Sequence, residues 1–140
     1  MSIFFTPNQA NNLLPEIRKR FNKIIDKRNE ITIIQNELNN VIIRDNSLKA
    51  FLEKKKELNR SLSSFYKEIE EIEDLGVLIK SLDEGLLDFP SKRFEDEVWL
   101  CWKSGEDSIK FWDGKDEGFS GRKPLSIKGT FNKDNLEDLR

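Results

Sequence analysis

The residues best suited to chemistry in this sequence are carboxylates and one arginine in its second half. Asp83, Asp88, Glu106 and Asp113 fall at predicted turns or strand ends, and Arg122 follows a glycine-rich segment. Carboxylates can bind Mg²⁺ or Ca²⁺ and can transfer protons. However, their spacing matches no known metal-binding loop, and acids at turns commonly accept local hydrogen bonds. A small-ligand or metal-assisted hydrolytic site and a purely structural role both stay open.

The absence of histidine narrows the chemistry further. It excludes a Ser-His-Asp triad, a Cys-His pair and the H-E-x-x-H zinc motif. The single cysteine, Cys101, lies between two tryptophans in a predicted strand, where a buried thiol would be inert, so we interpret it as a core residue. With one cysteine and no imidazole we expect no metal site and no cofactor. These absences favour a protein that is not an enzyme.

Residues 114–123 are rich in glycine and end in cations. Such a loop could bind phosphate, but it lacks the residue order of a P-loop. We favour a bent loop in which Arg122 pairs with a turn acid such as Glu106.

The three tryptophans could line a pocket or an interface, although in a small sheet they more often supply core area. They cannot all face one side of a sheet, so we expect Trp99 or Trp112 to be partly exposed. The ligand-binding candidates are Asp88, Trp99, Glu106, Trp112, Asp113 and Arg122.

Two long helices must precede these residues. Thr6-Pro7-Asn8-Gln9 predicts a capping box, helical spacing continues to about Ile43, polar residues 44–47 predict a turn, and Gly76 ends a second helix. The short turn predicts an antiparallel hairpin over 7–75, similar to a coiled coil. One register pairs the apolar residues of the two helices: Ile17 with Ile72, Phe21 with Ile69, Ile24 with Phe65, Ile31 with Leu58, and Leu38 with Leu52.

Polar residues follow the same register. It places Gln35 across from Lys55, either as a polar layer or as two solvated positions. It also sets the basic run 18–28 beside the acidic run 68–74. Pairing of these flanks explains the basic run better than nucleic-acid binding, for which the candidates are Lys19, Arg20, Lys23 and Lys27.

The tip of the hairpin is unusually apolar for a turn between two helices. Two helices alone cannot bury this end, and exposed apolar patches usually mark an interface. We therefore expect a homodimer or a protein partner. The interface candidates are Ile42, Ile43, Leu48, Phe51 and Leu52.

A small antiparallel sheet of about four strands follows the hairpin, which makes the fold class α+β. Strands are predicted at 76–82, 86–89, 97–103 and 108–112, with Pro90 stopping the second strand. In the third strand Val98, Leu100 and Trp102 share one face. A glycine-rich loop covers 114–125, and 126–140 is predicted to be a tail with one short helix at 134–139.

Length and composition agree with one domain over residues 1–125, comprising the hairpin (7–75) and the sheet with its glycine-rich loop (76–125). The 140 residues include ten Phe and three Trp, too many for a disordered chain, and the formal net charge is −2. The sequence contains no recognisable signal peptide or membrane span, and one cysteine fits a reducing compartment. We expect a cytoplasmic protein with no membrane contact.

Several motifs together resemble an uncharacterised prokaryotic family, domain of unknown function 2203. The resemblance covers about residues 4 to 125, in order. The motifs are Phe5–Asn11, Leu13–Ile17, Leu75–Val77, Asp83–Pro90, Leu100–Glu106, Ile109, Phe111-Trp112, Gly118–Arg122 and Pro124-Leu125.

The resemblance implies no activity, because the family has none established. Members of the family commonly carry a histidine after the second tryptophan of this region, where this chain has Asp113. If that histidine binds a metal or carries a proton, the resemblance implies that this chain has lost or replaced the role.

Overall fold

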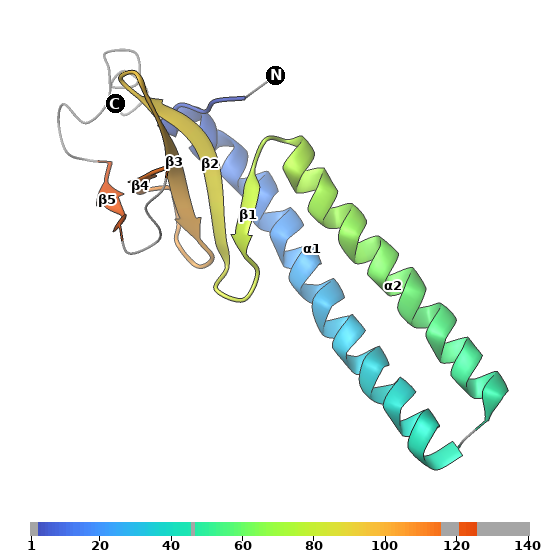
Figure 1. The fold of residues 1–140 in the computed structure, drawn as a ribbon. Coiled ribbons are helices and arrows are strands. Elements are labelled where there is room, and N and C mark those ends of the chain that lie inside the picture. Colours follow the sequence, from blue (N-terminus) through green and yellow to red (C-terminus); the bar gives the residue numbers. More distant parts are fainter. Residues whose placement is uncertain (1–2, 46, 116–120, 126–140) are drawn as a thin grey trace. The chain divides into compact units, whose positions relative to one another are not determined.

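The computed structural model describes residues 3–45, 47–115 and 121–125. Two helices, α1 (Pro7–Asn40) and α2 (Leu48–Asp74), are separated by a π-helical turn, η1 (Val41–Asp45). A five-stranded antiparallel sheet follows, in the order β1-β2-β3-β4-β5 (Figure 1). The strands are β1 (Leu78–Ser81), β2 (Leu86–Arg93), β3 (Asp96–Lys103), β4 (Phe111–Gly114) and β5 (Lys123–Pro124). The α+β class is confirmed, with one strand more than predicted.

The helix ends have the capping contacts that the sequence predicts. Thr6 Oγ1 accepts a hydrogen bond from the Gln9 amide at 3.1 Å, and Gln9 Oε1 accepts one from the Thr6 amide at 3.0 Å. Ser47 Oγ accepts a hydrogen bond from the Ala50 amide at the start of α2. Gly76 has a φ of +94°, which a residue with a side chain rarely adopts, and it ends α2.

The described chain forms two compact units, which we call the sheet unit and the hairpin unit. The sheet unit comprises the described residues within Met1–Lys19 and Ile72–Arg140, and the hairpin unit comprises those within Arg20–Glu71. The predicted tail and its short helix at 134–139 lie outside the described residues.

The hairpin unit has a small apolar core along its seam. Ile31, Ile34, Leu38 and Leu58 are buried in one cluster, which confirms that the predicted seam residues among them form a core. The predicted pairing of Leu38 with Leu52 is wrong. Phe51 packs against the core instead, while Leu52 is 47% exposed. Phe51 precedes Leu58 by seven residues, or two helical turns, and therefore lies on the same face of α2.

Charged residues flank this seam. Arg20 Nη1 lies 2.9 Å from Glu71 Oε2, and Lys54 Nζ lies 2.6 Å from Glu37 Oε2. The first contact confirms pairing between the basic and acidic runs. Gln35 and Lys55 are both exposed, so the solvated interpretation of this pair is correct and the buried polar layer is wrong.

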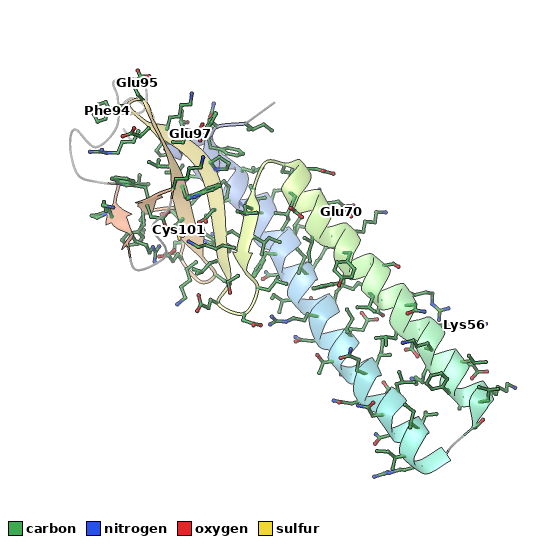
Figure 2. All side chains as sticks on the ribbon, in the orientation of Figure 1. Lys56, Glu70, Phe94, Glu95, Glu97 and Cys101 are labelled. Atoms are coloured by element: carbon green, nitrogen blue, oxygen red, sulfur yellow. The ribbon has the colours of Figure 1, made fainter. Side chains whose placement is uncertain are left out.

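In the sheet unit, the prediction that the second strand stops at Pro90 is wrong. Strand β2 continues through Pro90 to Arg93. The described ladder between β1 and β2 ends at the pair Leu78–Asp88, so Pro90 needs no amide hydrogen on that side. Its carbonyl accepts a hydrogen bond from the Phe5 amide at 2.7 Å. A two-residue turn at Phe94 and Glu95 then leads into β3, with Phe94 at a φ of 59° (Figure 2).

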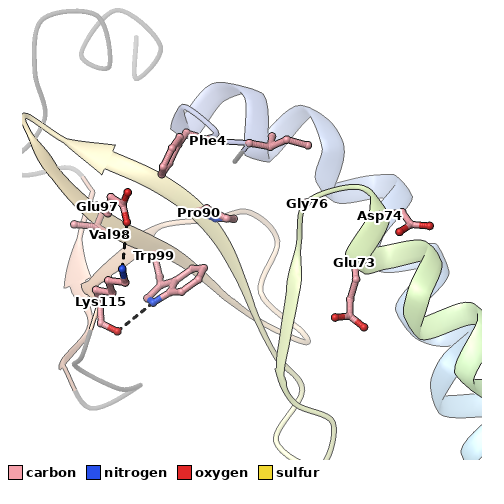
Figure 3. A pocket seen from close by; sticks show the side chains of 10 residues that line it. Phe4, Glu73, Asp74, Gly76, Pro90, Glu97, Val98, Trp99 and Lys115 are labelled. Carbon is pink, nitrogen blue, oxygen red and sulfur yellow. Dashed lines mark hydrogen bonds and ion pairs between the residues drawn. The ribbon is translucent and has the colours of Figure 1, made fainter. Parts of the chain in front are cut away.

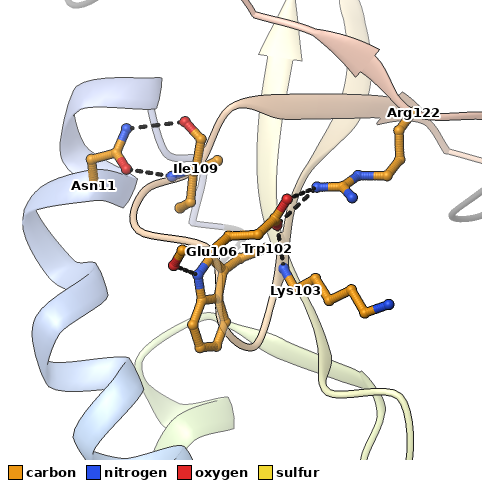
Figure 4. Close-up of polar contacts among 6 residues, drawn as sticks. All are labelled: Asn11, Trp102, Lys103, Glu106, Ile109 and Arg122. Carbon is orange, nitrogen blue, oxygen red and sulfur yellow. Dashed lines mark hydrogen bonds and ion pairs between the residues drawn. The ribbon is translucent and has the colours of Figure 1, made fainter.

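One face of the sheet, here the inner face, forms the apolar core of the sheet unit. Leu100 and Trp102 of β3 are buried together with their partners on β2, Phe89 and Leu87. The first turns of α1 lie close to this part of the sheet unit, since Asn11 exchanges hydrogen bonds with the backbone of Ile109 (Figure 4). These hydrogen bonds hold the first turns of α1 against the segment between β3 and β4.

Candidate functional site

Three potential ligand atoms lie close together on one face of the sheet. This is the face opposite to the inner face of Leu100 and Trp102, and we call it the outer face. Asp88 of β2 is the direct ladder partner of Cys101 on β3. Asp113 of β4 pairs with Trp99, two residues before Cys101, and therefore shares its face. One atom from each of Asp88, Cys101 and Asp113 lies within 4.8 Å of the other two. We call this trio the acid–thiol cluster.

All three members of the cluster are buried. The exposed fraction is 2% for Asp88 and 0% for both Cys101 and Asp113. Asp88 and Asp113 are predicted at turns or strand ends, but both lie within strands. Buried carboxylates are costly unless a positive charge or hydrogen bonds compensate them.

Burial also changes the protonation of the cluster. It raises the pKa of Asp88 to about 6; Asp113 acts in the same direction, whereas Lys80 and the Cys101 thiol oppose it. Burial raises the pKa of Cys101 to about 12, with a further contribution from the negative charge of Asp88. The Cys101 thiol is therefore protonated at neutral pH and is a weak nucleophile.

Hydrogen bonding leaves part of the cluster unsatisfied. Asp88 Oδ1 has no hydrogen-bond partner among the described residues. Its other oxygen, Oδ2, lies 3.9 Å from Lys80 Nζ, too far for a hydrogen bond. Asp88 Oδ1 is therefore a buried acceptor atom to which no described residue donates a hydrogen bond.

An ion pair lies beside the cluster. Arg122 Nη2 lies 2.8 Å from both carboxylate oxygens of Glu106, and only 12% of the Arg122 side chain is exposed (Figure 4). The Arg122 guanidinium also lies 3.9 Å from the ring centre of Phe111, the ladder partner of Cys101. This confirms the predicted pairing of Arg122 with Glu106 and places both residues near Asp88 and Asp113.

The β3–β4 loop holds Glu106 in place. Its carboxylate accepts a hydrogen bond from the Lys103 amide at 2.7 Å, and its backbone carbonyl accepts one from Trp102 Nε1 at 2.9 Å. Figure 4 shows these contacts together with the Arg122 pair. Because Glu106 is fixed by its own loop, Arg122 has a preformed partner.

A pocket of about 530 Å³ lies next to Trp99 in the sheet unit (Figure 3). Phe4, Pro90 and Trp99 supply apolar surface, and Trp99 is half-buried, which confirms the prediction of a partly exposed tryptophan. Trp99 Nε1 donates to the Lys115 carbonyl at 3.2 Å, and Lys115 Nζ lies 3.3 Å from Glu97. Glu73 and Asp74 add two more carboxylates to the lining.

Trp112 does not join this pocket or the cluster. It is the ladder partner of Leu100, shares the inner face and is 7% exposed. The structure therefore separates the six ligand-binding candidates. Asp88 and Asp113 are brought together, Glu106 and Arg122 form the neighbouring pair, Trp99 lines a pocket and Trp112 is a core residue.

Cys101 is buried, as predicted, but its proximity to Asp88 and Asp113 was not predicted from the sequence. Considered alone, a cysteine between two tryptophans indicates core packing. Two signals together could have predicted this proximity. The alternation of β3 places Cys101 and Leu100 on different faces of the sheet, and the register of β2 and β3 pairs Cys101 with Asp88.

The hairpin unit carries a separate apolar surface. Ile42 is 51% exposed, Ile43 78%, Leu48 72% and Leu52 47%. We call these four residues the tip patch. Phe51, the fifth interface candidate, is partly buried against the core of the hairpin.

Two of the four residues considered for nucleic-acid binding have acidic neighbours. Arg20 pairs with Glu71, and Lys27 Nζ lies 3.4 Å from Glu30 Oε2. Their charges are thereby partly balanced within the hairpin unit. Within the described residues, neither helix is apolar over a stretch long enough to span a membrane.

The fold and these sites define a small α+β protein, with a helical hairpin unit and an antiparallel sheet unit that encloses a buried acid–thiol cluster. The family model for the uncharacterized conserved protein DUF2203 matches residues 3–125, so the chain belongs to this family. No curated protein and no solved structure matches the chain.

Proposed function

We propose that this chain is a non-enzymatic assembly protein of the cytoplasm that forms a homodimer through the tip patch of its hairpin unit. The observation that carries the proposal is the exposure of four large aliphatic side chains at one end of a two-helix hairpin. Burial of such side chains contributes about 25 cal/mol for each Å² removed from water, so leaving four of them exposed is costly.

A second copy is the occupant that fits this patch best. The patch comes from the π-helical turn η1, which holds Ile42 and Ile43, and from the start of α2, which holds Leu48 and Leu52. Two helices enclose only one seam, and Phe51 stays partly buried beside it. A second hairpin turned by a two-fold axis would supply the same apolar stripe and complete a four-helix, coiled-coil-like core.

The charges around the patch are compatible with self-association. Arg44 and Lys49 are cations close to it in the sequence, and Glu53 is an exposed anion one turn after Lys49. Because both signs flank the patch, a two-fold axis can bring unlike charges together. A patch flanked by one sign only would repel its copy.

The test is the molar mass of the wild-type chain in solution, measured by sedimentation equilibrium over a wide range of concentration. We expect twice the chain mass for wild type and the chain mass for Ile43→Glu and Leu48→Glu. Neither residue is buried, so both variants should fold. Ile33→Glu is the matched control, because Ile33 is 60% exposed but is not part of the tip patch.

A monomeric wild type at every concentration would refute the proposal. Dimers that persist in Ile43→Glu and Leu48→Glu would refute the tip patch as the interface. If Ile33→Glu also abolished the dimer, a charge elsewhere on the hairpin would disrupt dimerisation equally. That result would also contradict the tip patch as the interface.

A second candidate function, small-ligand binding, is favoured by the Trp99 pocket. Its volume is in the range of ligand sites, and an aromatic wall beside Glu73, Asp74 and Glu97 suits an organic cation. Calorimetric titration with choline, and with 3,3-dimethylbutan-1-ol as its neutral isostere, tests this idea. Binding of choline alone, lost in Trp99→Ala, would support the pocket, whereas equal binding of both probes or of neither would contradict it.

A further inference from the structure

The acid–thiol cluster has the geometry of a small metal site. Its three potential ligand atoms come from three adjacent strands, β2, β3 and β4, and lie within 4.8 Å of one another. Strands of one sheet hold their side chains more rigidly than a loop, so the three groups are arranged before any ion arrives.

The burial of the cluster provides a second, independent observation. Only 2% of the Asp88 side chain is exposed, and its Oδ1 has no hydrogen-bond partner among the described residues. An unused acceptor oxygen in such a place costs free energy unless a ligand engages it. A cation bound between the three groups would neutralise the carboxylate that carries this oxygen.

The kinds of ligand atom indicate the kind of ion. Mg²⁺ and Ca²⁺ prefer six or more oxygen ligands, whereas this site offers one sulfur and two carboxylates. Zn²⁺ and Co²⁺ accept sulfur and oxygen together and need only three protein ligands and a water molecule. The enclosed position leaves little room for the larger shells of Mg²⁺ or Ca²⁺.

The charges around the cluster balance when a divalent ion is present. The ligands bring three negative charges once the Cys101 thiol has lost its proton, and Glu106 adds a fourth. Lys80 lies 3.9 Å from Asp88, and Arg122 acts on Cys101 through its charge. These two cations and a divalent ion together supply four positive charges.

We propose that Asp88, Cys101 and Asp113 bind one Zn²⁺-type divalent ion through two carboxylate oxygens and a thiolate sulfur. On binding, the Cys101 S–H bond breaks, its proton passes to solvent, and the sulfur electron pair forms the bond to the metal. The role would be structural, since the ion would tie together the three central strands from their outer face.

Cobalt is the probe for the test, because a Co²⁺–thiolate bond absorbs in the near ultraviolet whereas Co²⁺ bound by oxygen alone does not. The full chain is unfolded in denaturant with a chelator and refolded with Co²⁺, so that the buried site is accessible. We expect one Co²⁺ per chain, the thiolate band, and displacement of the band by Zn²⁺.

The variants connect the signal to the cluster. Cys101→Ser should lose the band, and Asp88→Asn and Asp113→Asn should each lower the affinity at least tenfold. Asp96→Asn, which changes an exposed carboxylate of β3, should bind as wild type does. Circular dichroism identifies any variant that does not fold.

The melting temperature of the wild-type chain gives a second readout, which does not depend on whether any variant folds. A bound ion stabilises the folded chain, so Zn²⁺ should raise this temperature. Folded wild type with neither the band nor a shift in melting temperature would overturn the proposal. A band that persists in Cys101→Ser, or unchanged affinity in both Asp variants, would also overturn it. The oligomeric state is measured separately, so either proposal can fail alone.

Discussion

Replacing Asp88 by asparagine removes one titrating group from the buried cluster and should change how stability depends on pH. Asp88 has a pKa of about 6 in the folded chain, against 3.8 for an ordinary aspartate. The folded chain therefore holds a proton more tightly than the unfolded chain. This group stabilises the fold fully below pH 3.8, and its contribution is lost as pH rises through about 6.

The magnitude follows from the two pKa values. A difference of about two units at 1.36 kcal/mol each corresponds to about 3 kcal/mol in all. About 2 kcal/mol of this falls between about pH 4.5 and about pH 7.5. The asparagine of the Asp88→Asn variant cannot titrate. The difference in free energy of unfolding, wild type minus variant, should therefore decrease by this amount as the pH rises over the interval.

Urea unfolding at several pH values, followed by tryptophan fluorescence, measures this difference. A chelator keeps the cluster free of metal, and one protein concentration keeps any association constant. Asp96→Asn is the control, because its exposed carboxylate should produce almost no pH-dependent difference. A difference for Asp88→Asn that stays flat to within about 0.5 kcal/mol, or that increases with pH, would refute the reasoning.

Four further substitutions should lower stability. Gly105→Ala should cost about 1 kcal/mol, because its φ is +103° although no atom lies within 4 Å of the new Cβ. Gly85→Ala should cost more, because its Cβ would lie 2.8 Å from Ser104 Cβ in addition to a φ of +69°; equal costs in thermal unfolding would contradict this. Arg122→Ala should cost about 2 kcal/mol in urea unfolding, since it leaves the Glu106 carboxylate without its cationic partner, and a neutral effect would mean that the pair is only a surface contact. Leu58→Ala should cost about 2–4 kcal/mol because Leu58 is 5% exposed in the hairpin core, whereas a cost below about 1 kcal/mol would show that this core is loosely packed.

Local patterns in the sequence determined the helices and their ends. Helical spacing of apolar residues, the Thr6–Gln9 capping box and Gly76 predicted α1 and α2 correctly, because each depends on residues within one or two turns. The same holds for the alternation in β3, which correctly predicted that Leu100 and Trp102 share one face. Such features need no knowledge of distant contacts.

Where the prediction for Pro90 failed, a distant contact decided the outcome. Pro90 ends a strand by its local rule, but here it lies beyond the described β1 ladder, and its carbonyl receives the Phe5 amide. The exchange of Leu52 for Phe51 in the seam, by contrast, follows local spacing. Phe51 precedes Leu58 by seven residues and shares its face of α2, whereas adjacent residues of a helix differ by about 100°.

The acid–thiol cluster depended most on tertiary structure. In the sequence, Asp88, Cys101 and Asp113 are well separated and have three different local explanations, namely a strand end, a core thiol and a turn acid. Only the register of three paired strands brings them to one face within 4.8 Å of one another. A shift of one residue in either ladder would send one of them to the other face, and a register follows from the packing of the whole sheet rather than from any local pattern.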